Sequence, residues 1–307
     1  MPSIKDLRKR IASVKNTQQT TKAMKMVSAA KLRRAQEAIV GQRPYAQTIR
    51  TMFLKTASGI ENLDRFPLVL RVLPENTKPR LLLVLVTSDR GLCGGFNANA
   101  IKFAARWLAA NENDYQRVQL AFVGKKGFDF YKTRRIDNGP HFSEITGKVS
   151  FIQAKKLSQH LLEQFSSGEA DEVKIIYNEF KNAISQTVIL EDYLPLRNVN
   201  RAMDAAATSN ANTPIQTPED GVPALVKPSL DGLFKALLER HFAIQAFRIL
   251  LESQAGEHGA RMSSMESATK NAGEMIKKLA LIYNKQRQAG ITKELLEIIS
   301  GSEAQKG

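Results

Sequence analysis

The chain begins and ends with long stretches that favour helix, and this feature most constrains its fold. Residues 3–57 contain only one glycine and one proline, Gly41 and Pro44, and helix-favouring residue types dominate the rest. Residues 229–303 contain no proline, and their apolar side chains keep a broadly helical spacing. We therefore predict one helix over residues 1–58 and a second over residues 229–303, with lengths of about 80 Å and about 105 Å at the usual rise per residue.

The first of these stretches carries the apolar seam of a coiled coil, because its apolar residues step by three and four. The apolar seam positions are Ile4, Leu7, Ile11, Val14, Leu32, Ala35 and Ile39. Gln18 and Thr21 occupy the seam between the two apolar runs, and polar side chains there weaken the pairing. We expect the two terminal helices to fold back against each other as an antiparallel, left-handed coiled coil.

The middle of the chain predicts a separate globular domain. Residues 59–79 are rich in proline and turn residues, which break helices and mark a connection. Residues 80–203 alternate apolar runs typical of buried strands with helix-favouring stretches, which predicts a Rossmann-like α/β domain. The expected strands are residues 81–89, 118–124, 172–180 and 187–196, and the expected helices are residues 97–110 and 153–166. Residues 204–228 are rich in Ala, Ser, Thr, Asn and Pro without periodicity, which predicts a loop or linker.

The positive charge is concentrated in the first helix. The whole chain has 45 Lys and Arg against 30 Asp and Glu, a formal net charge of +15. The first 56 residues contain 13 basic residues, and the only acidic ones among them are Asp6 and Glu37. This surplus indicates an acidic partner, which is a nucleic acid, an anionic membrane surface or an acidic protein.

The cysteine count and the hydropathy exclude several classes of protein. Cys93 is the only cysteine, so neither an intramolecular disulfide nor a zinc cluster of thiolates can form. No run of 18 apolar residues occurs, and the chain starts with charged residues where a signal peptide needs apolar ones. We therefore expect a soluble protein of the bacterial cytoplasm, without direct insertion into a membrane.

Three stretches of the sequence are distinctive. They are KNTQQTTKAMKMVSAAKLRRAQ (15–36), TSDRGLCGGFN (87–97), and ESQAGEHGARMSSMESATKNAGEMI followed by YNKQRQAGITKELLEIISG (252–276 and 283–301). In this order they resemble the gamma subunits of F-type ATP synthases. The resemblance implies a central rotor shaft, in which an asymmetric coiled coil rotates and couples ion flow through the membrane rotor to ATP synthesis or hydrolysis.

The same resemblance implies the partners and the location of the chain. The two long helices would form an axle inside a hexamer of catalytic beta and noncatalytic alpha subunits, and the globular domain would sit on the membrane rotor ring. The epsilon subunit is a further expected partner. The chain itself would be non-catalytic, would bind no cofactor, and would lie peripherally at the cytoplasmic face of the bacterial cell membrane.

The resemblance also implies two groups of partner-binding residues. The first group matches the family positions nearest the acidic lever segments of the catalytic subunits, and consists of Lys22, Met24 and Lys25. The second group matches positions that bond to catalytic-subunit loops or keep the two helices in register, and consists of Arg261, Arg287, Gln288, Thr292 and Glu294. The alternative for the second group is an ordinary solvated helix surface.

The unequal lengths of the two helices predict an unpaired end. About 70 residues against about 55 leave roughly 20 Å or more of the second helix without a partner. The apolar stripe that the first helix cannot cover there consists of Ile291, Leu295, Ile298 and Ile299. Another surface must bury this stripe, because an exposed one would be marginal in water. By resemblance, that surface is an apolar sleeve at the top of the hexamer, which acts as a bearing.

Glycines inside the second helix depart from the family pattern. Gly256, Gly259 and Gly290 stand where alanine or serine is more usual. An interior glycine destabilises a helix by about 1 kcal/mol relative to alanine, so these positions put the local stiffness of the helix in doubt.

The glycine-rich segment, the cysteine and the histidines could each belong to a chemical site, but a structural role explains them more simply. The segment GLCGG (91–95) follows an apolar strand but lacks both phosphate-loop spacings, so a tight turn is favoured over nucleotide binding. Cys93 has no neighbouring cysteine or histidine in the sequence that would activate its thiol. The four histidines lack ligand spacing, and they are His141, His160, His241 and His258. We expect no catalytic, cofactor or metal site.

Two other functions compete with the rotor shaft. A basic helix with heptads can lie along the phosphates of a nucleic acid, but no long clean zipper and no aromatic platform accompany it here. An enzyme built on the α/β domain would need a pocket that holds acids or bases with perturbed pKa values. No motif in the sequence indicates such a pocket.

Overall fold

A computed structural model describes the chain except at residues 1–2, 61, 72, 75–76, 135–136, 144, 146, 148, 184, 197–228 and 305–307. The predicted loop over residues 204–228 lies outside the described residues. The chain divides into two compact units, one formed by Met1–Ala30 with Arg261–Gly307 and the other by Lys31–Ala260. We call them the stalk unit and the domain unit, and describe each by itself.

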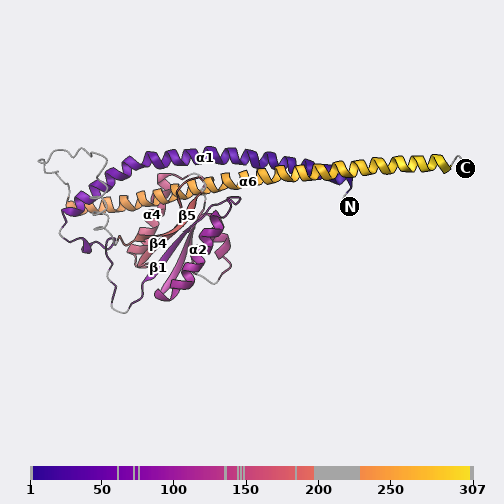
Figure 1. Cartoon of the computed structure of the whole chain (residues 1–307). Coiled ribbons are helices and arrows are strands. Elements are labelled where there is room, and N and C mark those ends of the chain that lie inside the picture. Colours follow the sequence, from indigo (N-terminus) through magenta and orange to yellow (C-terminus); the bar gives the residue numbers. More distant parts are fainter. Residues whose placement is uncertain are drawn as a thin grey trace. The chain divides into compact units, whose positions relative to one another are not determined.

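Two long helices begin and end the described chain (Figure 1). Helix α1 spans Ile4–Ser58 with 55 residues, and α6 spans Leu230–Ala304 with 75 residues. The Ser3 hydroxyl accepts a hydrogen bond from the Asp6 amide at 3.2 Å, which caps the start of α1. Both predicted helices are confirmed, and each contributes residues to both units.

The domain unit contains one sheet of five strands. The strands are β1 (Arg80–Val86), β2 (Arg117–Val123), β3 (Asp137–Phe142), β4 (Glu172–Phe180) and β5 (Gln186–Leu194). Their order is β3-β2-β1-β4-β5, in which the first four strands are parallel and β5 pairs antiparallel with β4. This is the strand order of a Rossmann-like sheet, as the sequence predicts.

Three helices connect the parallel strands. They are α2 (Phe96–Asn111), α3 (Lys125–Tyr131) and α4 (Phe151–Ser166), and short 3-10 helices cover Leu63–Arg65 and Glu112–Asp114. A capping box starts α4, because Ser150 and Gln153 exchange side-chain and backbone hydrogen bonds there. Helix α3 and strand β3 escape the sequence prediction.

Both faces of β1 are buried, so alternate residues of this strand belong to two different cores. On one face, Leu81, Leu83 and Leu85 pack with side chains of α2. On the other face, Leu82, Val84 and Val86 share a core with residues of α4, of α1 and of α6. The parts of α1 and α6 that lie in the domain unit are therefore built into its core. Phe53 of α1 and Phe234 of α6 stack in this core, with ring centroids 5.2 Å apart.

Candidate partner-binding surface

Polar side chains join α1 and α6 within the stalk unit. Thr269 Oγ1 donates a hydrogen bond to Thr21 Oγ1 at 2.8 Å, and Gln18 Nε2 donates to the carbonyl oxygen of Thr269 at 3.5 Å. The side chain of Thr21 is buried. Gln18 and Thr21 thus each form a hydrogen bond from α1 to α6. These bonds take the place of the apolar contacts that other seam residues make.

The first predicted group lies beside this polar contact on α1. Lys25 Nζ pairs with Glu266 Oε1 of α6 at 2.6 Å, and the Lys25 side chain is half-buried. Met24 is also half-buried, whereas Lys22 is exposed. The charge of Lys25 is therefore matched within the chain, and the charge of Lys22 faces solvent.

Two exposed apolar residues next to this group were missed by the sequence analysis. Met26 is 61% exposed and Val27 is 56% exposed, although both stand on a strongly basic helix. Met26 lies one turn from Lys22, so the two side chains share a face. The signal was present in the sequence, because continuing the spacing of three and four from Thr21 places the seam at residues 25 and 28, with both apolar residues between them.

The second predicted group is not one cluster. Arg261 is buried, with 8% exposure, and it takes part in polar or electrostatic contacts within the chain. It precedes the nearest other member by 26 residues of α6, which at the helical rise is about 39 Å. The other four members are exposed, and they are Arg287, Gln288, Thr292 and Glu294. A solvated surface thus describes these four residues but not Arg261.

The end of α6 exposes the predicted apolar stripe. Ile291 is 49% exposed, Leu295 54%, Ile298 68% and Ile299 53%. The side chain of Ile4, in the first turn of α1, lies 3.8 Å from the Cβ position of Gly290. Helix α1 therefore starts opposite the residue at which the stripe begins. Leu296, which the sequence analysis missed, is 59% exposed in the same segment.

An ion-pair network fixes α6 to the sheet within the domain unit. Arg248 Nη2 lies 2.7 Å from Glu191 Oε2, and Arg248 Nη1 lies 3.1 Å from Glu252 Oε1. The Tyr177 hydroxyl donates to Glu191 Oε2 at 2.8 Å. Burial opposes the charge of Arg248, but the two carboxylates outweigh it and raise the pKa of this guanidinium. Burial raises the pKa of Glu252, although Arg248 opposes the shift.

The glycine-rich segment forms a turn between β1 and α2, as the sequence predicts. Asn97 closes this turn, because its side chain accepts a hydrogen bond from the Ser88 amide at 2.9 Å and donates to Ser88 Oγ at 2.8 Å. Cys93 is buried beside them. The polar groups at the carboxyl end of β1 thus bond to one another, in the position where related sheets bind ligands.

The described residues include neither a metal-binding group nor a helix suited to span a membrane. No three His, Cys, Asp or Glu side chains in this part of the chain are grouped closely enough to hold a metal ion. None of the described helices combines the length and the apolar character that crossing a membrane requires.

Comparisons with known proteins agree with one another. A family model described as ATP synthase matches residues 3–305. The ATP synthase gamma chain of Anaeromyxobacter sp. (strain Fw109-5) is 46% identical over 308 residues, which cover 100% of both chains. A chain of the mitochondrial ATP synthase of Tetrahymena thermophila, solved with its central stalk and c-ring, is 25% identical with a TM-score of 0.55. That alignment covers 81% of the present chain and 99% of the other.

A second solved structure shows the same fold at lower identity. A chain from the OSCP, F1 and c-ring assembly of the Euglena gracilis mitochondrial ATP synthase aligns with a TM-score of 0.61 at 21% identity. The alignment covers 98% of the present chain and 94% of the other, so the likeness extends over both terminal helices and the sheet.

Proposed function

This chain belongs to the ATP synthase gamma chain family, and from that premise we propose which of its surfaces meet the other subunits. It is the central rotor shaft of an F-type ATP synthase and a non-catalytic subunit. It couples ion flow through the membrane rotor to the synthesis or hydrolysis of ATP, which its partner subunits catalyse. Those partners are the alpha and beta subunits, the epsilon subunit and the membrane rotor ring.

The chain acts at the cytoplasmic face of the bacterial cell membrane, as a peripheral subunit. The relatives that match over the whole chain support this location, because they include gamma chains of the bacteria Anaeromyxobacter and Bdellovibrio at 46% and 44% identity. Contact with the membrane is then indirect and runs through the rotor ring.

The observation that carries the mechanism is the unequal pairing of the two helices. Ile4 of α1 lies opposite Gly290, whereas α6 continues to Ala304. The shaft is therefore a helix pair over most of the stalk unit and a single helix beyond Gly290.

The helix pair is not circular in cross-section. Each of the three surrounding catalytic sites therefore meets a different face of the shaft and has a different affinity for nucleotide. Rotation exchanges these three states, and linkage makes the coupling reciprocal.

Lys22, Met24 and Lys25 form the surface that receives force from the catalytic subunits. Support comes from charge, because an acidic lever segment is complementary to a basic helix whose Lys22 faces solvent. Lys25 is already paired with Glu266, so it holds α1 against α6 at the level of the contact. The exposed Met26 adds apolar area on the face of Lys22.

The far end of α6 meets the hexamer in two ways. Arg287, Gln288, Thr292 and Glu294 are exposed polar side chains that can bond to loops of the catalytic subunits. The stripe of Ile291, Leu295, Ile298 and Ile299 fits an apolar sleeve. Apolar contact holds the tip in position without hydrogen bonds that would have to break at each step, so it suits a bearing.

Reconstitution tests this function. The purified chain is mixed with alpha and beta subunits of a bacterial ATP synthase, and ATP hydrolysis and rotation of a bead attached to the sheet domain are measured. We expect no ATP hydrolysis by the chain alone, and rotation in three steps per turn once the hexamer forms. A chain that failed to enter the hexamer but bound DNA at physiological salt would contradict the proposal and favour the nucleic-acid alternative.

A further inference from the structure

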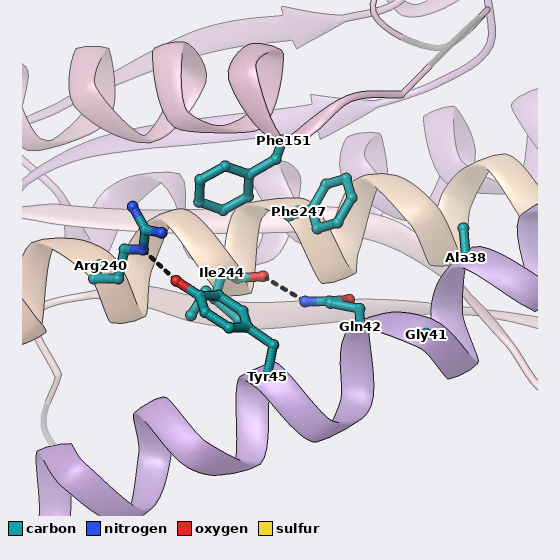
Figure 2. A pocket seen from close by; sticks show the side chains of 8 residues that line it. All are labelled: Ala38, Gly41, Gln42, Tyr45, Phe151, Arg240, Ile244 and Phe247. Carbon is teal, nitrogen blue, oxygen red and sulfur yellow. Dashed lines mark hydrogen bonds between the residues drawn. The ribbon is translucent and has the colours of Figure 1, made fainter.

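A cavity of about 340 Å³, open to solvent, lies in the domain unit, and no function is assigned to it so far. It is lined by α1, by the facing stretch of α6 and by the first residue of α4 (Figure 2). The side chains that line it include aromatic rings at one side and the guanidinium of Arg240 at one end. Its volume falls within the range of roughly 300–1,000 Å³ that is usual for small-molecule sites.

The wall that α1 contributes is open at Gly41. A Cβ atom added to Gly41 would meet no atom within 4 Å, so close packing does not require a glycine there. Glycine inside a helix is less stable than alanine, and α1 continues for 17 residues beyond this position. Ala38, one turn earlier, is the other small residue of this wall. The chain thus keeps space open at a position where a larger side chain would fit.

The polar end of the cavity is held in place by aromatic rings. Arg240 Nε donates to the Tyr45 hydroxyl at 2.6 Å, as Figure 2 shows. The guanidinium carbon lies 5.0 Å from the centroid of the Phe151 ring and 5.5 Å from that of Tyr45. Arg240 and Tyr45 are both exposed, so the guanidinium is restrained by these contacts at the mouth of the cavity, and its two terminal nitrogens can donate to a ligand.

The charge of the cavity is not neutralised from within. The eight lining residues include no Asp or Glu. No ion pair joins Arg240 to a carboxylate among the described residues. Gln42 Nε2 donates to the carbonyl oxygen of Ile244 at 3.3 Å, which leaves the Gln42 side chain as a second polar group in the wall. A ligand with one negative charge would therefore gain a charge-assisted bond that no protein group supplies.

The remaining surface of the cavity is apolar. Phe151 and Phe247 meet edge to face, with ring centroids 5.7 Å apart, and the side chain of Ile244 lies below them in Figure 2. A flat ring packs well against such a pair, because aromatic rings attract one another in offset and edge-to-face arrangements. We propose that this cavity is a binding site for a small aromatic carboxylate, whose carboxylate pairs with Arg240 and whose ring packs against Phe151 and Phe247. This site is independent of the surfaces that meet the catalytic subunits.

Titration with 2-naphthoate tests the proposal, because this probe has one carboxylate and one flat apolar body. We expect it to bind the full-length chain with a dissociation constant of about 0.1 mM, the affinity usual for a probe of this size. The neutral isostere 2-naphthamide should bind at least tenfold more weakly. Calorimetry and ligand-observed NMR measure both constants. Absence of naphthoate binding at millimolar concentration, or equal binding of the amide, would overturn the proposal.

Two variants locate the site, and a third is their control. Gly41→Leu should abolish naphthoate binding by filling the cavity while leaving the helix content intact. Arg240→Gln should weaken binding at least tenfold, whereas Arg43→Gln, which removes an exposed arginine outside the cavity, should leave the constant unchanged. Binding that survived Gly41→Leu would place the probe elsewhere and refute the site.

The assembled ATP synthase decides whether the site is open in the complex. The same titration with the purified complex should give a constant within a few-fold of that of the chain, again lost with Gly41→Leu. If the complex does not bind the probe, a partner subunit fills the cavity and the proposal of a small-molecule site is wrong. That result would leave the rotor function of the chain unaffected.

Discussion

Lys25 and Glu266 form an ion pair that joins α1 to α6 within the stalk unit, with 2.6 Å between Lys25 Nζ and Glu266 Oε1. The side chains are 37% and 60% exposed, so the pair adds at most about 1 kcal/mol to the stability of the chain. Its position next to Met24 makes it more important for geometry than for stability, because it sets how closely the two helices approach at the proposed coupling surface.

A charge exchange at this pair tests its role. Lys25→Glu and Glu266→Lys should each lower the number of ions pumped per ATP hydrolysed, because like charges then face each other across the helix pair. The double variant should recover most of the loss, since it restores an ion pair in the opposite orientation. Coupling is measured in vesicles that contain the complex. A double variant no better than the single ones would show that the pair does not act as a unit.

A new charge at Met24 should uncouple the complex without preventing its assembly. Met24→Lys places a third cation beside Lys22 and Lys25, and this cation can trap an acidic lever segment in a strong, charge-assisted bond. Ion pumping should then fall several-fold while the subunits still copurify. Val40→Lys serves as the control, because Val40 is 58% exposed on the same helix but lies outside this group. Unchanged pumping and hydrolysis with Met24→Lys would mean that the coupling surface lies elsewhere.

Gln288→Ala should lower the turnover of the assembled complex but not the helicity of the chain. Gln288 accepts a hydrogen bond from Thr292 Oγ1 at its carbonyl oxygen at 3.0 Å, and alanine keeps that oxygen. Any loss of turnover must therefore come from lost contacts between the Gln288 side chain and partner subunits. Lys285→Ala, also exposed on α6, is the matched substitution. Equal turnover of wild type and Gln288→Ala would identify this segment as ordinary solvated surface.

His241 should make the stability of the chain depend on pH between about 4 and 6.5. Burial, with the nearby charges of Arg50 and Arg248, lowers the pKa of His241 to about 4, although Glu191 opposes the shift. The unfolded chain binds a proton below its ordinary pKa of about 6.5 while the folded chain does not, so stability falls as the pH drops through this window. The shift corresponds to a loss of up to about 3 kcal/mol, complete near pH 4.

The substitution His241→Phe isolates this contribution. Phenylalanine keeps a ring that can stack on Phe53, as His241 does at 5.3 Å, and it cannot be protonated. Urea unfolding at pH 7 and at pH 4.5 should show a smaller loss of stability for the variant than for wild type. The same loss in both proteins would mean that other groups cause the acid sensitivity.

Deletion of the residues after Gly290 should weaken the complex without preventing its formation. The sheet domain and the paired part of the stalk remain, so the shortened chain should fold and assemble. The complex should melt at a lower temperature and produce less torque, because the apolar stripe that we propose to contact the sleeve is gone. Leu295→Ser should reproduce part of the loss, and Leu281→Ser, at 71% exposure outside the tip, should not. Failure to assemble, or full stability and torque, would each contradict the bearing.

Long, strongly periodic elements could be predicted from the sequence, and short elements at the sheet edge could not. Strand β3 has the sequence DNGPHF, in which glycine and proline obscure any strand pattern. Pro140 is tolerated because β3 lies at the edge of the described sheet, where it pairs with β2. Helix α3 has seven residues, too few for a helical period to be recognised.

The surface residues were harder to predict than the fold, because a sequence does not show which side chains bond within the chain. Lys25 and Lys22 look alike in the sequence, yet only Lys25 is paired in the structure. The sequence places Arg261 in the same predicted group as Gln288, but the Arg261 side chain is buried in the structure. These differences depend on contacts between residues more than 200 positions apart, such as Lys25 and Glu266.

Gly256 and Gly259 lie where the backbone of α6 packs closely against the sheet domain. A Cβ atom on Gly259 would lie 2.9 Å from the carbonyl oxygen of Ala183, and one on Gly256 would lie 3.2 Å from the ring of Phe96. At Gly259 the backbone of α6 thus rests directly on the backbone of the sheet domain, and at Gly256 it rests on the side chains of Phe96 and Gln186. We expect such a close contact to have little elastic compliance in torsion. The twist that a rotary motor stores between steps must therefore accumulate in other parts of its transmission, and this joint should pass angular displacement on almost without delay.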